Sequence, residues 1–428
     1  MVEGIITVYA QYASCKMRKE VKRMRKLRTT ILIALLVCCL TVLCGCTTWD
    51  NFKSAFIDKQ DTETTIQIGV LEPVTGADSK AAEDEIRGIQ LANKVHPNVN
   101  GKLISLVFSD DKSDIDATET AAKTLVDKKP MVILGSYGNV YSLAASPYIK
   151  EAKIPAIAIT NTNPLVTENN PYYYRVCYVT SNQGDLLARY ILESENKNVA
   201  GVLLPANNDV ALAEATAFVD RIKAETDNDD SIAYYEEYTT GQKDFTDVLT
   251  KLAESGVKNV MLPGDYTDAA NILNQAADMG LDVTFLGDSQ WESEDFLKLL
   301  NENVKSGNIA FVQFFAADNK GVQGEAVTKE RQSFLKAYNE EYGNDSEPSD
   351  AMALGYDAYF VALDAIDKAP DDATSEEINA ILADPQYSFE GATGLINFNA
   401  NGDPIKTAYI TTWQNGKMAT IYTVEALK

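Results

Sequence analysis

The chain has 428 residues, of which 45% are hydrophobic and 23% are charged, which is enough for two globular domains with hydrophobic cores. Its 62 acidic and 38 basic residues give a formal charge of −24, so its surface repels phosphate backbones, which argues against nucleic acid as a partner. The single histidine, His96, argues against histidine-based zinc sites and most Ser-His or Cys-His hydrolases. The composition therefore favours binding over covalent chemistry, without a metal or another cofactor.

The N-terminal residues have the pattern of an export signal. Residues 1–45 hold eight basic and two acidic residues, and they precede an acidic body. The apolar run 31–43 is shorter than the roughly 20 residues that span a bilayer, and it fits the core of a secretory signal. Leu43-Cys44-Gly45-Cys46 resembles a bacterial lipobox, in which Cys46 carries a lipid and becomes the first residue of the mature protein. Residues 1–45 are therefore predicted to be a signal peptide, with an uncleaved anchor as the alternative.

Residues 46–64 are polar and lack a sustained period, so we expect a lipid-anchored tether. With the signal removed and Cys46 lipidated, Cys177 would be the remaining cysteine, and it could form no internal disulfide. No histidine lies near Cys177 in sequence, which favours a buried, inert thiol. Both interpretations of the N-terminus place the folded body outside the cytoplasm, anchored to the bacterial membrane.

From residue 65 onward the apolar periodicity alternates between that of strands and that of helices. Short, nearly continuous apolar runs indicate strands buried on both faces, as in a parallel sheet. The alternation occurs in two successive series, which predicts two lobes of one α/β architecture. The first series has strands at 66–71, 103–108, 131–134 and 156–159, and helices at 81–95, 115–125 and 141–152. The second has helices at 186–192, 211–222, 245–252 and 269–279, and strands at 199–204, 232–238, 257–262 and 283–286. Helices at 329–342 and 351–366 follow, and residues 394–424 are strand-rich.

Two loops at strand ends carry polar side chains where open α/β sheets bind ligands. After strand 131–134, a glycine-containing loop leads into a helix whose first N–H groups could bind an anion, with Ser136 and Asn139 as further donors. The alternative is that Asn139 caps that helix. After strand 156–159, Thr160 and Thr162 could face the same side at a period of two, although a solvated turn explains the same residues.

Short motifs along the chain, each weak alone, lie in one register over roughly 360 residues. They are Ile68-Gly-Val-Leu-Glu-Pro-Val-Thr-Gly76, Arg87-Gly-Ile-Gln-Leu-Ala92, Asn161-Thr-Asn-Pro164, Asn182-Gln-Gly184, Asn207-Asn-Asp209, Lys243-Asp-Phe245, Pro263-Gly-Asp-Tyr266, Gly287-Asp288, Gly355-Tyr-Asp-Ala358 and Gly391-Ala-Thr-Gly394. In this order they resemble the type I periplasmic binding proteins, specifically the leucine/isoleucine/valine-binding family of ABC transporter receptors.

The resemblance implies an α/β fold with two Rossmann-like lobes, whose parallel sheets are joined by a hinge of three crossovers. These crossovers are expected near Thr180, Phe314 and Gly394. Such a receptor is not an enzyme; it closes on a small ligand and serves an ABC transporter permease, here as a monomer. Lobe 1 would comprise residues 65–180 and 315–393, and lobe 2 residues 181–314 and 394–428.

The resemblance also implies a site for a zwitterionic amino acid. Family members hold the ligand carboxylate by hydroxyl and backbone N–H groups of one lobe, and the ammonium by acidic and tyrosine groups of the other. An anion site facing a cation site would fix such a ligand by charge-assisted hydrogen bonds. For each acidic residue, a solvated surface carboxylate is the alternative. The candidate ligand-binding residues are Ser136, Tyr137, Asn139, Thr160, Asn161 and Thr162 in lobe 1, and Asp209, Asp265, Tyr266, Asp288, Trp291 and Glu292 in lobe 2.

The chain departs from the family pattern after Asn208-Asp209, where Val210 stands in place of a tyrosine that commonly covers the ligand. Compared with family members that have this tyrosine, we expect either a larger pocket or a different ligand. Two functions remain open: a transport receptor for a branched-chain or related small amino acid, and an interaction or sensor lipoprotein of the same fold. No motif specifies the ligand or the permease.

Overall fold

The computed structural model describes residues 65–193, 200–316, 328–344 and 346–424, and the chain from Glu63 onward forms a compact unit by itself. The predicted signal peptide, Cys46 and the tether lie outside the described residues. Within the described ranges, no helix combines the length and the apolarity that crossing a membrane requires.

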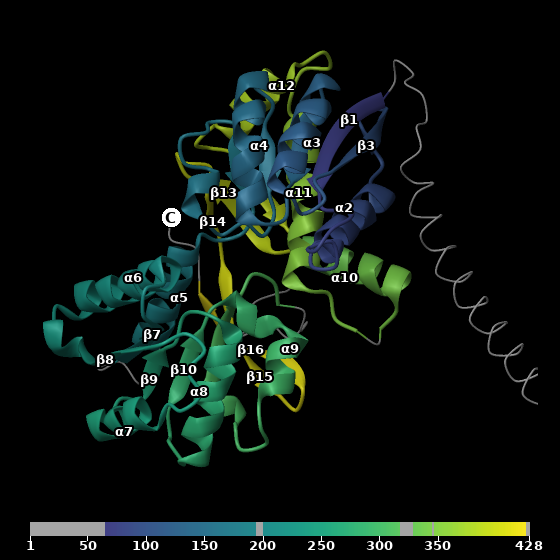
Figure 1. Ribbon diagram of the computed structural model, residues 1–428. Helices are drawn as coiled ribbons and strands as arrows, with labels where there is room; N and C mark the ends of the chain where they lie inside the picture. Colours follow the sequence, from purple (N-terminus) through teal and green to yellow (C-terminus); the bar gives the residue numbers. More distant parts are fainter. Residues whose placement is uncertain (1–64, 194–199, 317–327, 345, 425–428) are drawn as a thin grey trace, which may run out of the picture. The chain divides into compact units, whose positions relative to one another are not determined.

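The first lobe is built on a sheet with the strand order β2-β3-β1-β4-β5-β6 (Figure 1). All neighbours in it pair in parallel except β2 with β3. Its strands are β1 (Thr65–Glu72), β2 (Asn98–Val99), β3 (Lys102–Asp110), β4 (Val132–Gly135), β5 (Ala156–Ala158) and β6 (Tyr173–Arg175). The α/β fold with parallel-rich sheets in two lobes, as predicted, is confirmed.

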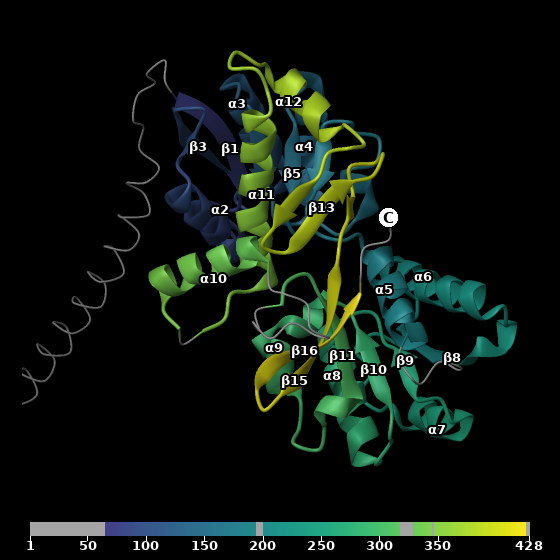
Figure 2. The same ribbon diagram turned by 180° about the vertical axis from the view of Figure 1, so that it is seen from behind.

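Helices cover both faces of this first sheet because its strands carry apolar side chains on both sides. On one face, Ile68 and Val70 of β1 belong to the same core as α2 (Glu83–Val95) and α11 (Asp350–Asp367). On the other face, Leu71 packs in a core with α3 (Ile115–Asp127) and α4 (Asn139–Ala152). Figure 2 shows α11 and α12 (Ser375–Leu382) in front of the sheet, on the side opposite to the α3 and α4 pair of Figure 1.

The second lobe has the strand order β16-β15-β11-β10-β9-β7-β8. Its parallel strands are β7 (Ala200–Pro205), β8 (Ile232–Tyr238), β9 (Asn259–Met261), β10 (Thr284–Gly287) and β11 (Ile309–Gln313), and β15 (Ala408–Gln414) and β16 (Lys417–Val424) add antiparallel pairs. Side chains of α5 (Thr180–Glu193) and α6 (Asp209–Thr226) share one core with this sheet, and those of α7 (Thr246–Ser255) and α8 (Tyr266–Asp278) share another.

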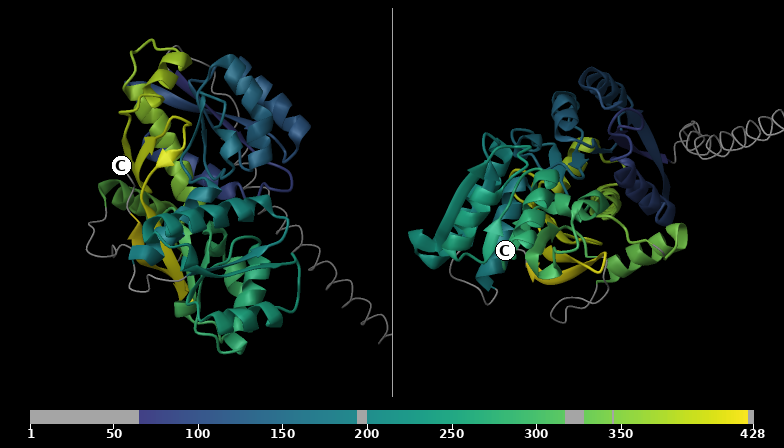
Figure 3. Two further views of the ribbon diagram at one scale, coloured as in Figure 1. Left: turned by 90° about the vertical axis from the view of Figure 1, so that its left-hand side faces the viewer. Right: turned by 60° about the horizontal axis from the view of Figure 1, so that its bottom comes forward.

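The chain passes between the lobes after β6, after β11 and before β15. The last passage differs from the predicted position at Gly394, because β13 (Gly394–Phe398) pairs with β12 (Phe389–Gly391) and β14 (Pro404–Ile405) in a separate small sheet. The chain reaches the second lobe's sheet only at Ala408. Figure 3 shows these C-terminal strands, in yellow, running from one lobe to the other.

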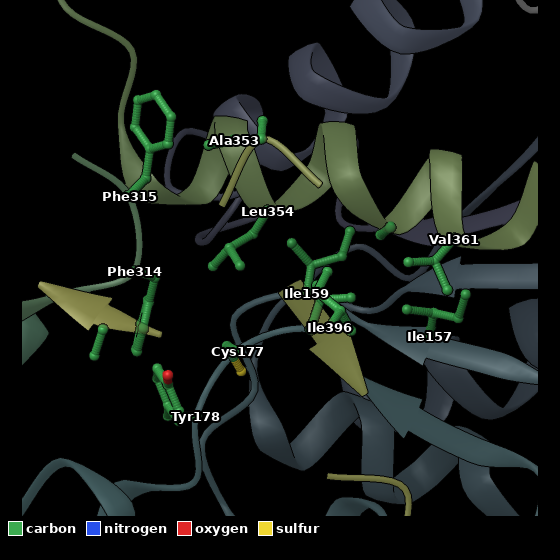
Figure 4. Close-up of a cluster of buried hydrophobic side chains, with 14 of the residues drawn as sticks. Ile157, Ile159, Cys177, Tyr178, Phe314, Phe315, Ala353, Leu354, Val361 and Ile396 are labelled. Atoms are coloured by element: carbon green, nitrogen blue, oxygen red, sulfur yellow. The ribbon is translucent and has the colours of Figure 1, made fainter. Parts of the chain in front are cut away.

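The connections between the lobes pack against one another in a hydrophobic cluster (Figure 4). The rings of Tyr178, after β6, and Phe314, after β11, are 5.5 Å apart between centroids. Cys177 lies in the same cluster with no exposed surface, and burial raises the pKa of its thiol to about 12. The prediction of a buried cysteine is confirmed, and a thiol with so high a pKa is unreactive near neutral pH.

Candidate functional site

A cleft of about 930 Å³ lies where the carboxyl ends of strands from both lobes meet. Parallel strands end at one edge of a sheet, so loops that are distant in sequence converge there. Tyr137, Thr160 and Thr162 line the cleft from lobe 1, and Asp288 and Glu292 line it from lobe 2. Val210, Gln183 and Asp350 also line it, together with Thr180 and Phe314 of the connections between the lobes.

In lobe 1, the predicted anion-binding donors already donate hydrogen bonds to carboxylates of the protein. Ser136 Oγ donates to Asp111, which follows β3. The backbone N–H of Tyr137 donates to Glu72 Oε2 over 3.0 Å, and Thr160 Oγ1 donates to Glu85. Buried carboxylates from β1, from α2 and from the loop after β3 therefore lie behind this corner of the cleft.

Glu72 ends β1 and Glu85 lies in the first turn of α2, and neither has exposed surface. Burial disfavours their ionised forms and raises the pKa of Glu85 to about 7. Burial, with the neighbouring carboxylates of Glu85 and Asp111, raises the pKa of Glu72 well above its usual value. Two carboxylates in one site cannot both ionise easily, so the pair keeps a proton that isolated glutamates would lose.

Asn139 and Asn161 hold the two polar loops of lobe 1 together. Asn139 Oδ1 accepts a hydrogen bond from the Asn163 backbone N–H over 3.1 Å, and Gly138, not Asn139, is the N-cap of α4. The side chain of Asn161 is buried and donates to Ser136 O over 2.9 Å and to Ser142 Oγ over 3.1 Å. These residues position the loops and do not line the cleft.

In lobe 2, Asp288 follows β10 and is almost completely buried, although it lines the cleft. Its carboxylate accepts the backbone N–H and the side-chain amide of Gln290, each over 2.9 Å. Burial raises the pKa of Asp288 to about 6. On α6, buried Glu214 lies close enough that Asp288 adds to the effect of burial in raising its pKa.

Glu292 connects the two lobes at the cleft. Its Oε1 accepts the backbone N–H of Asp350, the first residue of α11, over 2.9 Å. The Asp350 carboxylate in turn accepts the backbone N–H groups of Phe314 (2.6 Å) and Phe315 (3.0 Å), which follow β11. Burial raises the pKa of Asp350 to about 7, and burial with Asp350 nearby raises that of Glu292 well above its usual value.

The remaining candidates of lobe 2 are not among the residues that line the cleft. Asp265 is the exposed N-cap of α8, where it accepts the Thr267 and Asp268 backbone N–H groups, and Tyr266 is the first residue of that helix. Asp209 is exposed at the start of α6. Trp291 has no exposed surface and stacks on Phe296 with ring centroids 4.9 Å apart, so it belongs to the lobe 2 core.

Sequence reasoning missed Glu72, Asp111 and Gln183. Glu72 and Asp111 stand directly at or after the ends of β1 and β3, so the rule that pointed to Thr160 could have found them. Gln183 lies within the Asn182-Gln-Gly184 motif, and its Oε1 accepts the backbone N–H of Ser289 over 2.9 Å. Among the described residues, no group of three or more His, Cys, Asp or Glu side chains is arranged to hold a metal ion.

Comparisons with known proteins show the family to which this fold belongs. Residues 65–417 match the family model described as periplasmic binding protein. The chain is 24% identical over 362 residues to Leu/Ile/Val-binding protein homolog 2 of Brucella abortus, covering 82% of this chain and 91% of that protein. Among solved structures, it is similar to the leucine binding protein LivK of Thermotoga maritima (TM-score 0.67, 26% identity, 84% of this chain and 99% of that chain). It is also similar to the branched-chain amino acid transporter substrate binding protein LivJ of Streptococcus pneumoniae, solved with isoleucine (TM-score 0.66, 28% identity, 84% and 99%). The chain therefore belongs to the periplasmic binding protein family, as a type I member of its branched-chain amino acid group, and is a binding protein rather than an enzyme.

Proposed function

We propose that this protein is an extracytoplasmic receptor that binds a small amino acid or a related compound between its lobes and delivers it to an ABC transporter permease. The observation that carries the proposal is the cleft of about 930 Å³, which polar side chains line from both lobes. The connections between the lobes border the same cleft, so closure of the lobes would enclose a ligand there. Relatives that are named for leucine, isoleucine and valine binding support the amino acid class.

The lining residues suit a ligand that carries an ammonium group. Asp288 offers a buried carboxylate in lobe 2, and Thr162 offers a hydroxyl in lobe 1. Water expelled on closure would strengthen both interactions. Val210, which is 58% exposed and lines the cleft, leaves more room than a tyrosine would at the same position.

Calorimetric titration of the purified full chain in detergent with each of the twenty amino acids tests the proposal. We expect heat of binding for at least one of them, with a rise in melting temperature that grows with ligand concentration. Replacement of Thr162 by valine should weaken the binding of that ligand by roughly 1–3 kcal/mol. The reason is that a desolvated polar group of the ligand loses the Thr162 hydroxyl as its hydrogen-bond donor. The absence of binding across amino acids and small carboxylates would contradict the proposal and favour an interaction or sensor role.

The proposal includes a monomeric protein that is anchored to the membrane by a lipid on Cys46. The sequence around Cys46 supports this anchoring, because a basic segment, an apolar run and Leu43-Cys44-Gly45 precede it. Cell fractionation of the wild type and of a Cys46→Ser variant tests it. We expect the wild type in the membrane fraction and loss of the lipid-modified form in the variant; equal lipid labelling of both would contradict the assignment.

A further inference from the structure

We propose that the cleft selects a ligand with a net positive charge, such as a basic amino acid or a small diamine, over a branched-chain amino acid. This inference rests on the proposed function, since it names the ligand class of the same site. It follows from the partners of the lobe 1 donors, from the charges that line the cleft and from the buried carboxylate oxygens behind it.

The donors that would hold a ligand carboxylate in lobe 1 are already used. Ser136 Oγ, the Tyr137 backbone N–H and Thr160 Oγ1 donate to Asp111, Glu72 and Glu85, respectively. A ligand carboxylate at this corner would compete with these protein carboxylates for the same hydrogens. It would also lie beside charges of its own sign, which a partly desolvated site penalises strongly.

An ammonium or guanidinium group fits the same corner. Thr160 lines the cleft and contacts Glu85 directly, so the buried carboxylates lie immediately behind the lining. The Glu72 and Glu85 side chains are hydrogen-bonded to each other, and Glu72 Oε1 and Glu85 Oε2 have no further partner among the described residues. A cationic group near Thr160 would favour the ionised form of this pair, and the ring of Tyr137, which also lines the cleft, suits a cation as well.

Carboxyl groups outnumber amino groups along the rest of the cleft. Acidic lining residues come from both lobes, whereas the basic lining residues are Lys298 and Lys417. Lys298 is paired with Glu294 (3.4 Å) and Asp295 (3.1 Å), so its charge is largely balanced. The acidic lining residues are Asp84, Asp288, Glu292, Glu294, Glu347 and Asp350.

In lobe 2, Glu214 adds a second buried carboxyl group next to Asp288, and a nearby cation would favour its ionised form. Glu214 is 1% exposed, and its Oε1 accepts no hydrogen bond from the described residues. The ammonium of an ordinary zwitterion would be balanced by Asp288 alone. The carboxylates of both lobes together are balanced better by a ligand with two cationic groups.

Calorimetric competition between leucine, lysine, arginine and putrescine, with the full chain in detergent, tests the inference. We expect lysine, arginine or putrescine to bind at least about tenfold more tightly than leucine, which corresponds to about 1.4 kcal/mol. Preference for lysine or arginine over putrescine would identify a basic amino acid, and the reverse a diamine. Tighter binding of leucine would overturn the inference and leave the proposed function intact, whereas silence across all twenty amino acids and putrescine would overturn both.

A Glu85→Gln variant tests the role of the buried pair, with Glu151→Gln as a matched control on the exposed surface of the same lobe. The glutamine amide oxygen can still accept the Thr160 hydroxyl, so the variant keeps this contact and removes the second negative charge that the pair would gain when a cation binds. We expect affinity for the cationic ligand to fall at least about tenfold in Glu85→Gln and to stay unchanged in the control. If Glu85→Gln strongly lowers the melting temperature, the affinity of an Asp288→Asn variant for the cationic ligand tests the same idea in lobe 2. Unchanged affinity in a folded variant of either residue would overturn the inference.

Proton release on binding gives an independent readout. A bound cation lowers the pKa of the Glu72–Glu85 pair, so binding should release a proton and affinity should rise as the pH increases from 6 to 8. The titratable groups that face this pair are Asp84 on α2, Asp111 after β3, Tyr137 before α4, Tyr173 on β6 and Cys177 after β6. Calorimetric titration of the same ligand in phosphate and in Tris buffer measures the number of protons released, because the two buffers take up a proton with different enthalpies. Zero proton release with pH-independent affinity would overturn the assignment to the buried pair.

Discussion

Replacement of Gly88 by alanine tests how closely α2 and α11 pack. A Cβ atom at this position would lie 2.2 Å from Met352 O and 2.8 Å from Tyr356 N. Both contacts are backbone atoms of α11, and the first is about 1 Å shorter than the ~3.3 Å at which a carbon normally meets a carbonyl oxygen. The helices must therefore separate, because a flexible side chain cannot move away to make room. Gly355 on α11 makes the reciprocal approach, since its Cβ would lie 2.4 Å from Glu85 O.

The expected magnitude combines two opposing effects. Overpacking of a well-filled contact costs about 1–3 kcal/mol, and the higher helix propensity of alanine returns about 1 kcal/mol. With two backbone contacts below 3 Å, we expect the upper part of that range to apply. The free energy of unfolding should fall by about 1–2 kcal/mol, and the melting temperature by roughly 1–3 °C. Because α2 carries Glu85, the displacement should also weaken ligand binding.

Scanning calorimetry of the wild type, Gly88→Ala and Gly307→Ala measures this effect. A Cβ at Gly307 would meet no atom within 4 Å, so that variant makes the same chemical change without the contact. We expect the melting temperature of the control to remain within about 0.6 °C of the wild type, in line with ordinary surface substitutions. An equal or higher melting temperature for Gly88→Ala would refute the idea that the two helices touch through their backbones.

Two further predictions concern buried charges. The pKa values of Glu85 and Asp350 are raised to about 7, above the ordinary values of 4.5 and 3.8, so between about pH 4 and 7 the folded state holds protons that the unfolded chain has lost. The free energy of unfolding should therefore fall as the pH rises through this window, and a melting temperature that is lower at pH 5.5 than at pH 8 would contradict the assignment. Lys406 is 2% exposed and donates to Thr393 Oγ1 and to Val176 O, and Lys406→Met would leave the buried Asp357 carboxylate without a nearby cation. We expect chemical denaturation to show a loss of roughly 3–5 kcal/mol, and a loss below about 1 kcal/mol would show that the hydrogen bonds to Asp357 suffice.

Much of the fold follows from the sequence because buried parallel strands and amphipathic helices leave strong local patterns. The predicted bounds of the strand 232–238 and the helix 329–342 coincide with β8 and α10. The strand β11 was not predicted, although each of its residues is buried. A short run of five apolar and polar residues becomes a strand only when strands that are close in space pair with it. The strand β11 pairs with β10 and with β15, and β15 lies about 100 residues further along the sequence.

The sheet-edge rule points to residues that line the cleft, but it does not give the contacts that these residues make. Thr160 and Thr162 reach the cleft because the edge of a parallel sheet is a general binding position. Trp291 was expected in the wall, but its ring packs over Gly287, where even a Cβ would lie 2.2 Å from it. Which ring fills the space beside a glycine depends on the tertiary packing and does not follow from the local sequence pattern. The same holds for the pairing of Thr160 with Glu85, which stands on another element 75 positions earlier.

The place of β15 and β16 has a consequence for biosynthesis. Until Ala408 and the residues after it have emerged from the ribosome, β11 forms an open margin of its sheet, with backbone groups that lack their final partner strand. A truncated or slowly completed chain would therefore expose an unpaired strand edge, with which other nascent polypeptides could pair. Pairing of β15 with β11 covers that edge, so the sheet of the second lobe is completed only after a strand about 100 residues further along the chain has been made.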